Sequence, residues 1–218
     1  MKKILTLLYL FLIQLSATSQ IQATYKIDRF CTEKSPYIET YLKVYPSGLN
    51  LDSNKNKIGI EVLQIIKDLK NNIIDYKKYN IYQSIKADSS IDNIIDLQRF
   101  QLSNNNYVIE VEIKDIFSNN KAQKHSEKFS LEFDENEISL SDIELIDSYW
   151  KTNEISKITK SGYAIVPLVT DYFSPNFTRI AYYFEIYNSD KYFNNNSYIL
   201  RESIKIKETG NIAGKFNR

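Results

Sequence analysis

Three residues near the end of the chain have the types and the spacing of a small recognition strip. Tyr183, Glu185 and Tyr187 alternate within RIAYYFEIYN, so on a strand they would share one face while the apolar residues between them share the other. Two tyrosine rings flanking a carboxylate could stack on sugar rings or anchor a protein partner. The alternative is that both faces of this strand are covered and the tyrosines only pack.

Two pairs of carboxylates could also do chemistry. Asp142 and Glu144 lie two residues apart, as do Glu110 and Glu112. Glycoside hydrolysis requires two carboxyl groups at a set separation, which a sequence does not reveal. On strands each pair is more simply part of a polar outer face. We therefore expect no catalytic residue here and keep a carboxylate-pair glycoside hydrolase as an alternative.

A calcium site is a further alternative, at the junction between two predicted domains. Carboxylate oxygens are the ligands that Ca²⁺ prefers, but a dedicated loop spaces them with Asp, Asn and Gly in a set pattern. The acidic residues at the junction lack that spacing, and the sequence predicts neither a metal nor another cofactor. These residues are Asp134, Glu135, Glu137 and Asp142.

The remaining reactive residues are too few for the common catalytic sites. Cys31 is the only cysteine and His125 the only histidine, so neither a zinc site nor a nucleophile with its base is expected. The chain also lacks a Gly-x-Ser-x-Gly elbow and a His-Glu-x-x-His pair, and its 5 glycines do not form a phosphate loop. These absences favour a protein that is not an enzyme.

Composition limits the partners. The 218 residues have a formal net charge of +1 and 25% charged residues, which provides no concentrated basic face for nucleic acid. The hydrophobic share of 43%, with 17 Tyr and 11 Phe, is ample for one or two packed cores. A single cysteine makes no internal disulfide, so stability must come from packing.

Residues 1–19 have the features of a secretory signal peptide. A basic start precedes an apolar run over residues 4–15, and the small residues Ala17 and Ser19 suit a cleavage site. The run is too short for a comfortable membrane span. Because Cys31 lies well downstream of the cleavage point, we expect a protein that is not a lipoprotein. We also expect it not to insert in the membrane after processing, and to lie in the periplasm or at the outer membrane.

Period-two alternation dominates residues 20–134 and predicts an immunoglobulin-like β-sandwich. The most regular strand is YVIEVEIK, which begins at Tyr107. Tyr107 follows a turn of three asparagines, and we expect its hydroxyl to bond back to the upstream backbone as a tyrosine corner. Asn105 or Asn106 is expected to adopt a left-handed conformation there.

Residues 135–218 predict a second and smaller β unit that is incomplete as a sandwich. Four further strands are expected within SLSDIELI, SGYAIVPLVTDYF, RIAYYFEIYN and YILRESIKIKETG, with a loop over residues 151–161. Pro167 favours an edge position or a bulge, and Gly162 is also given a structural role. The fold class is therefore all-β throughout.

The order of these segments resembles the N-terminal half of the GWxTD-domain proteins of Bacteroidota. The resemblance lies in QRFQL, a turn and Tyr107 leading VIEVEIKD, followed by LSDIELI, KSGYAIVP and YYFEIYNSD. The Gly-Trp-x-Thr-Asp motif itself is absent, because the only tryptophan, Trp150, lies in DSYWKTNE. The resemblance implies an exported, envelope-associated protein with no established reaction.

The sequence therefore favours a non-enzymatic scaffold or protein-interaction module of the bacterial cell envelope. The expected partner is another envelope protein or the C-terminal domain of a longer chain. Carbohydrate binding through Tyr183 and Tyr187, with Glu185 between them, is the alternative function.

Overall fold

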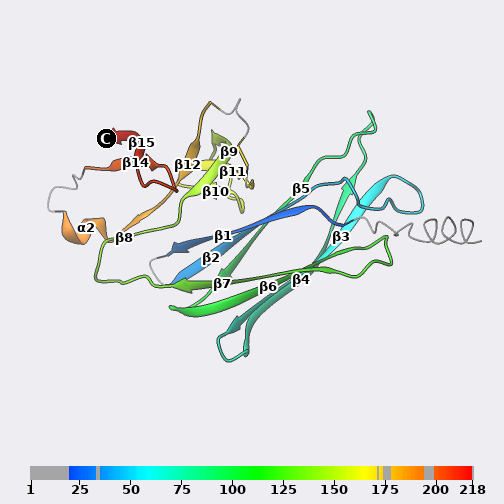
Figure 1. Cartoon of the computed structure of the whole chain (residues 1–218), viewed down its shortest axis with the longest axis horizontal. Helices are drawn as coiled ribbons and strands as arrows, with labels where there is room; N and C mark the ends of the chain where they lie inside the picture. The colour runs from blue at the N-terminus through cyan, green and yellow to red at the C-terminus, as the bar shows by residue number, and fades with distance from the viewer. Residues whose placement is uncertain (1–19, 33–34, 171, 174–177, 194–198, 218) are drawn as a thin grey trace, which may run out of the picture.

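Two antiparallel sheets packed face to face form the larger part of the protein (Figure 1). The computed structural model describes residues 20–32, 35–170, 172–173, 178–193 and 199–217. The predicted signal peptide lies outside the described residues. Almost all regular structure within them is β, which confirms the predicted fold class.

The order of the strands is that of an immunoglobulin-like sandwich. One sheet has the order β1-β2-β5 and the other β4-β3-β6-β7. In the constant-type immunoglobulin arrangement the fourth strand joins the first sheet, whereas β4 here pairs along its length with β3 in the second. The strands are β1 (Ala23–Cys31), β2 (Pro36–Val44), β3 (Lys57–Asp68), β4 (Ile73–Ser84), β5 (Ile94–Gln101), β6 (Asn105–Asp115) and β7 (Gln123–Leu131).

The core lies between the two sheets and follows the alternation of the sequence. On β6 the buried residues recur at every second position, as expected for a strand with one covered face. β3 follows this alternation over most of its length, whereas β2 is buried on both faces from Ile38 to Leu42. The fully buried residues of this cluster include Ile38, Leu42, Val44, Ile58, Ile60, Val62, Ile66, Ile109 and Leu131.

One polar side chain is buried within this core with its hydrogen bonds satisfied. Gln64 Oε1 accepts from the hydroxyls of Thr40 at 2.9 Å and Tyr25 at 3.1 Å, while its Nε2 donates to Tyr79 at 2.8 Å. Tyr79 in turn donates to Asp96. A satisfied network links the two sheets, which is the condition under which a buried amide is tolerated.

Tyr107 forms the hydrogen bond that a tyrosine corner requires. Its hydroxyl donates to the carbonyl oxygen of Ser103 at 2.9 Å, four residues upstream, and its ring stacks on Phe129 with 5.4 Å between centroids. The side chain is buried. Tyr107 therefore ties the β5–β6 connection to the start of β6.

The prediction of a left-handed conformation at Asn105 or Asn106 is wrong. Neither has a positive φ, and Asn105 is already an extended residue of β6 that pairs with Leu131. The connection from β5 crosses from one sheet to the other, so it does not need the tight reversal of a hairpin. Asn104 supports the corner instead, because its side-chain amide donates to the Phe133 carbonyl at 2.7 Å and accepts from the Phe133 amide at 3.0 Å.

Replacing Tyr107 by phenylalanine should lower the free energy of unfolding by about 1 kcal/mol, because the ring packing remains while the Ser103 carbonyl loses its donor. Chemical denaturation of the two proteins measures the difference. Tyr76→Phe is the matched control, since Tyr76 is exposed on β4. Equal stabilities of wild type and Tyr107→Phe would show that the corner bond contributes nothing.

Residues after 134 form three small sheets at one end of the sandwich (Figure 1). The sheets have the orders β10-β11-β9-β12, β13-β8 and β14-β15. The expected loop over residues 151–161 is interrupted, because β9 reaches Lys151 and β10 occupies Thr159–Lys160. The elements are β8 (Ser139–Leu140), β9 (Glu144–Lys151), β10 (Thr159–Lys160), β11 (Tyr163–Pro167), β12 (Ala181–Tyr183), β13 (Ile186–Tyr187), the helix α2 (Ser189–Tyr192), β14 (Arg201–Lys205) and β15 (Ile212–Asn217).

Gly162 shapes the β10–β11 hairpin, which carries Lys160, and Pro167 shapes the end of β11. Gly162 has φ of 80° and Ser161 φ of 48°, so both central residues of the β10–β11 turn are left-handed, which favours glycine. The β9–β11 register shifts between Val166 and Pro167. Pro167 therefore lies at a bulge, where a residue without an amide hydrogen is tolerated.

The second unit buries little apolar surface of its own. Among the described residues after 134, only a few belong to the buried apolar set, while many large apolar side chains are exposed. The buried ones are Ile146, Ala164, Ile165 and Val169. Such a unit depends on contacts with the sandwich, and its exposed apolar surface is available to a partner.

Candidate functional site

The predicted strip of Tyr183, Glu185 and Tyr187 is not an open stacking platform. Both tyrosine hydroxyls donate to Glu185, from Tyr183 at 2.7 Å and from Tyr187 at 2.6 Å. Tyr187 also accepts from the backbone amide of Cys31 at 2.9 Å, and the Tyr183 ring lies 6.5 Å from that of Phe30. All three residues are half-buried, and burial raises the pKa of each tyrosine.

A break in the expected strand explains this arrangement. Residues 179–188 do not form one strand but the two short strands β12 and β13, which pair with β9 and β8 respectively. Between them the Glu185 carbonyl accepts from the Ser141 amide at 2.9 Å, and the Ser141 hydroxyl accepts from the Glu185 amide at 2.8 Å. The two tyrosines therefore attach the second unit to the end of β1. Their rings are engaged in these contacts and are not free to stack on sugars.

A buried group of charged side chains lies where the second unit covers the sheet β1-β2-β5. Lys160 Nζ is 2.6 Å from Glu39 Oε2 and 2.6 Å from Glu144 Oε2. The exposed fractions of the three side chains are 5%, 0% and 1%. β2 positions Glu39, β9 positions Glu144 and the β10–β11 hairpin positions Lys160, so this junction cluster joins both units.

Arg99, Tyr41 and Phe30 complete the junction cluster. Arg99 Nε donates to Glu39 Oε1 at 2.7 Å and Tyr41 donates its hydroxyl hydrogen to Glu39 Oε2. Lys160 Nζ lies 3.9 Å from the centroid of the Phe30 ring. A cation over an aromatic face is stabilised when it is shielded from water. Glu39 is thus held as a carboxylate between two cations.

The Glu144 carboxylate has fewer hydrogen-bond partners than the Glu39 carboxylate. Its Oε2 binds Lys160, whereas its Oε1 is buried and has no hydrogen-bond partner among the described residues. Burial raises the pKa of the Glu144 carboxyl above its usual range, against the attraction of Lys160. The adjacent Asp28 is also buried, and burial raises its pKa to about 6 although Lys26 is 2.8 Å away.

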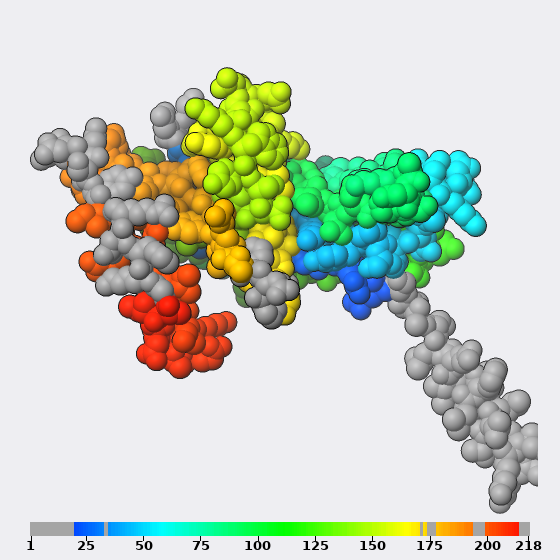
Figure 2. All heavy atoms as spheres, turned by 90° about the horizontal axis from the view of Figure 1, so that it is seen from above, coloured from blue at the N-terminus to red at the C-terminus, as the bar shows by residue number. Residues whose placement is uncertain are grey.

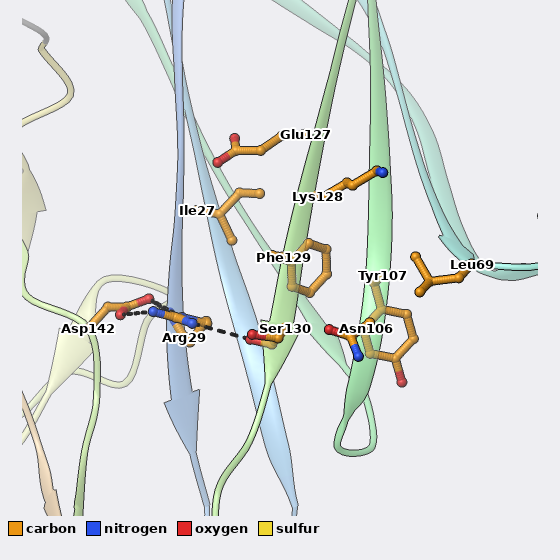
Figure 3. Close-up of a pocket in the computed structure, with 10 residues that line it drawn as sticks. All are labelled: Ile27, Arg29, Leu69, Asn106, Tyr107, Glu127, Lys128, Phe129, Ser130 and Asp142. Carbon is orange, nitrogen blue, oxygen red and sulfur yellow. Dashed lines mark hydrogen bonds and ion pairs between the residues drawn. The ribbon is translucent and has the colours of Figure 1, made fainter.

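A second contact between the units closes one side of a pocket of about 530 Å³ between β1 and β7 (Figure 3). Arg29 binds Asp142 through Nε and Nη2, both at 2.7 Å, and its Nη1 donates to the Ser130 carbonyl at 3.3 Å. Ile27, Phe129 and Leu69 supply apolar lining. The bidentate geometry orients Asp142 as a structural ion-pair partner.

The carboxylate pairs considered for hydrolysis are each bound to cations. Asp142 binds Arg29 and Glu144 binds Lys160, while Glu110 is 2.7 Å from Lys67 and Glu112 is bonded to Lys124. The expectation that Glu144 lies on a polar outer face is wrong, because the second unit folds this part of β9 against the sandwich.

The acidic residues considered for a calcium site do not converge on a common position that an ion could occupy. Asp134 and Glu135 line an open cleft of about 1200 Å³, in which the Lys191 ammonium donates to the Glu135 carbonyl at 2.7 Å. Asp134 accepts from the Asn136 amide, which is a local turn contact. The described residues contain no group of three or more His, Cys, Asp or Glu that could hold a metal ion. The calcium alternative therefore has no geometric support in this part of the chain.

Cys31 follows Phe30 at the end of β1, and His125 lies on β7 beside Tyr25. Burial raises the pKa of the Cys31 thiol, which opposes thiolate formation, and its Sγ contacts the Thr32 carbonyl at 3.1 Å. His125 is on β7, about half exposed, 3.7 Å from Glu127. The structure does not bring these two residues together.

An aromatic groove of about 520 Å³ lies along the sheet β10-β11-β9-β12, and Lys160 is among the residues that line it. Tyr149 and Tyr163 form one wall with their rings edge to face at 6.2 Å, and their exposed fractions are 60% and 42%. Tyr182, Phe184 and Ile180 line the opposite wall. Figure 2 shows the residues around position 150, in lime green, standing out from the surface beside the sandwich.

Sequence reasoning missed the junction cluster and the groove. Glu39 and Tyr41 alternate with the apolar residues of β2, so they were expected on an outer face, and Lys160 was placed at the end of a loop. The available signal was weak: Tyr37 and Tyr41 flank Glu39 on the outer face of β2, and two aromatic rings make this face more apolar than a solvated face usually is.

The comparisons with known proteins do not identify a relative, since no family model and no curated protein matches the chain. Within the described residues no helix is long and apolar enough to cross a membrane. The resemblance to GWxTD-domain proteins therefore stays a prediction from the sequence.

Proposed function

We propose that this protein is a non-enzymatic scaffold and protein-interaction module of the bacterial cell envelope. The observation that carries the proposal is the aromatic groove, because exposed and closely spaced tyrosines are typical of protein-binding surfaces. The junction cluster supports it, since buried ion pairs set the orientation of the sheet that carries the groove relative to the sandwich. A rigid sheet loses little conformational entropy when a partner binds.

The proposed partner is a folded envelope protein or a C-terminal domain of a longer chain, as the GWxTD resemblance implies. In either case its apolar side chains would cover the groove between Tyr149 and Ile180. The mass of the native polypeptide in envelope fractions distinguishes the two, because a mass well above that of the processed chain would place the partner in the same polypeptide.

The Tyr149→Ala, Tyr163→Ala double variant should lose the partner. Truncating an anchor tyrosine costs about 2 kcal/mol or more, so each of the two substitutions should weaken the Kd at least roughly 30-fold. The measurement is crosslinking in envelope fractions followed by quantitative mass spectrometry, comparing wild type with the double variant. Tyr76→Ala is the matched control, because Tyr76 is equally exposed but lies on β4 of the sandwich.

Partners that are retained by wild type and Tyr76→Ala but lost by the double variant would support the proposal. Identical partners for all three proteins would contradict it. Competition by soluble glycans, with no crosslinked protein, would instead favour carbohydrate binding in the groove, through rings other than the predicted Tyr187.

A further inference from the structure

Lys160 and Glu144 form an ion pair that is unusually close and unusually well shielded from water. Their charged atoms are 2.6 Å apart, both side chains are almost completely buried, and the rings of Phe30 and Tyr183 lie 3.9 Å and 5.3 Å from the ammonium. Burial favours the neutral form of the Glu144 carboxyl, and transfer of one ammonium proton to it would leave an amine beside a carboxylic acid. The neutral forms, an amine and a carboxylic acid, are the reactants of amide formation.

The two carboxylates around Lys160 differ in their hydrogen-bond partners, and this difference gives them different roles. Glu39 receives hydrogen bonds on both oxygens, from Arg99, Tyr41 and Lys160, which fix it beside the ammonium as an acceptor and not as the carboxyl that is attacked. Glu144 has Lys160 as its ion-pair partner, and its second oxygen is buried without one. Glu144 is therefore the carboxyl that more readily takes up a proton and becomes open to attack.

We propose that Lys160 and Glu144 condense to form an intramolecular amide bond, with Glu39 as the proton carrier. The reaction needs no cofactor or further reactant, and it goes beyond the proposed binding function. It would join β10 to β9 covalently beneath the aromatic groove.

The atoms balance as follows. One proton of the Lys160 ammonium passes to Glu144, which leaves a free amine beside a carboxylic acid. The amine lone pair attacks Cδ of Glu144 to form a C–N bond, and Glu39, 2.6 Å from Nζ, takes a second proton from the nitrogen. Glu39 returns this proton to the departing hydroxyl of Glu144, the C–O bond breaks, and one water molecule leaves. One positive and one negative charge disappear.

Two physical effects favour this product over the separated groups. Reactants held in contact by a fold reach effective concentrations of about 10⁵–10⁸ M, which offsets the tendency of amides to hydrolyse. The product also removes two buried charges, one of which has an unsatisfied oxygen, and a neutral amide costs less to bury.

The test is the intact mass of the full chain, purified from a host that exports it, with its N-terminal residue determined so that the expected mass is known. We expect a deficit of one water molecule, and after proteolysis a branched peptide that joins Lys160 to Glu144. Glu39→Gln should restore the full mass, because an amide does not carry the proton. Glu110→Gln is the matched control, since Glu110 is 2.7 Å from Lys67 in an exposed pair and should leave the deficit unchanged.

Each remaining outcome would overturn the inference. A wild-type chain of full mass after prolonged incubation would show that the ion pair does not react. A deficit located at a cyclised aspartate, or an amide between Lys160 and Glu39, would refute the assignment of Glu144. The branched peptide is sought in the wild-type protein, so the test stands even where Glu39→Gln fails to fold, and it is independent of partner binding.

Discussion

Replacing Lys160 by methionine is expected to lower the free energy of unfolding by about 3–5 kcal/mol. The substitution keeps the length and the apolar stem of the side chain but leaves the carboxylates of Glu39 and Glu144 buried without their shared cation. An amide-linked pair would add to this loss, because the variant would also lack the covalent link between β9 and β10. Denaturant unfolding, followed by a probe of the sandwich and a probe of the second unit, measures it.

Two further variants show whether the loss comes from uncompensated buried charge. Adding Glu144→Gln to Lys160→Met should recover part of the stability, since it removes the buried charge that has lost its cation, whereas Glu39 keeps Arg99. Lys67→Met is the matched control and should cost less than about 1 kcal/mol, because its partner Glu110 is 38% exposed. A loss at Lys160 no larger than that at Lys67 would contradict the role given to the junction cluster.

The contribution of Asp28 to stability should rise by about 2 to 3 kcal/mol as the pH falls from about 7.5 to 4. Burial raises the pKa of Asp28 from 3.8 to about 6 in the folded protein. Between these values the folded state binds the proton more tightly than the unfolded state does, so ionisation at higher pH destabilises the fold. The side chain is 3% exposed, so solvent does not screen this effect.

The Asp28→Asn variant isolates this contribution, because asparagine does not titrate while Glu144, whose pKa is also raised, still does. The difference in unfolding free energy between variant and wild type should shift in favour of the variant by the same 2 to 3 kcal/mol as the pH rises. Asp92→Asn serves as the control, since Asp92 is largely exposed in its pair with Lys86. Parallel pH profiles of wild type and Asp28→Asn would refute the prediction.

The proposed binding function and the junction cluster depend on each other through the second unit. That unit buries few apolar residues of its own, so its sheet is positioned by Lys160, by the Arg29–Asp142 pair and by Glu185 between its two tyrosines. A variant that weakens the junction should therefore also weaken partner binding at the groove, although no groove residue has changed.

Much of the sandwich could be predicted from the sequence because alternation is a local property. The strand of Tyr107, Ile109 and Val111 buries the face that its period-two pattern indicates, and Tyr107 makes the expected backward bond. Pro167 lies at a bulge for the local reason that it lacks an amide hydrogen. Asn105 was misjudged because its conformation depends on whether β5 and β6 share a sheet, which is a question of topology.

By itself the sequence determined the all-β class and, for strands of the sandwich such as β6, the face that is buried. Only the tertiary structure decided what covers the other face. The alternation of β2 places Glu39 and Tyr41 opposite the core, but nothing local specifies that Lys160, 121 residues further along the chain, comes to lie against them. A strand has two faces and its pattern describes only their polarity, so the partners of a polar face are set by contacts between distant segments. For that reason the junction cluster and the aromatic groove became visible only in the folded chain.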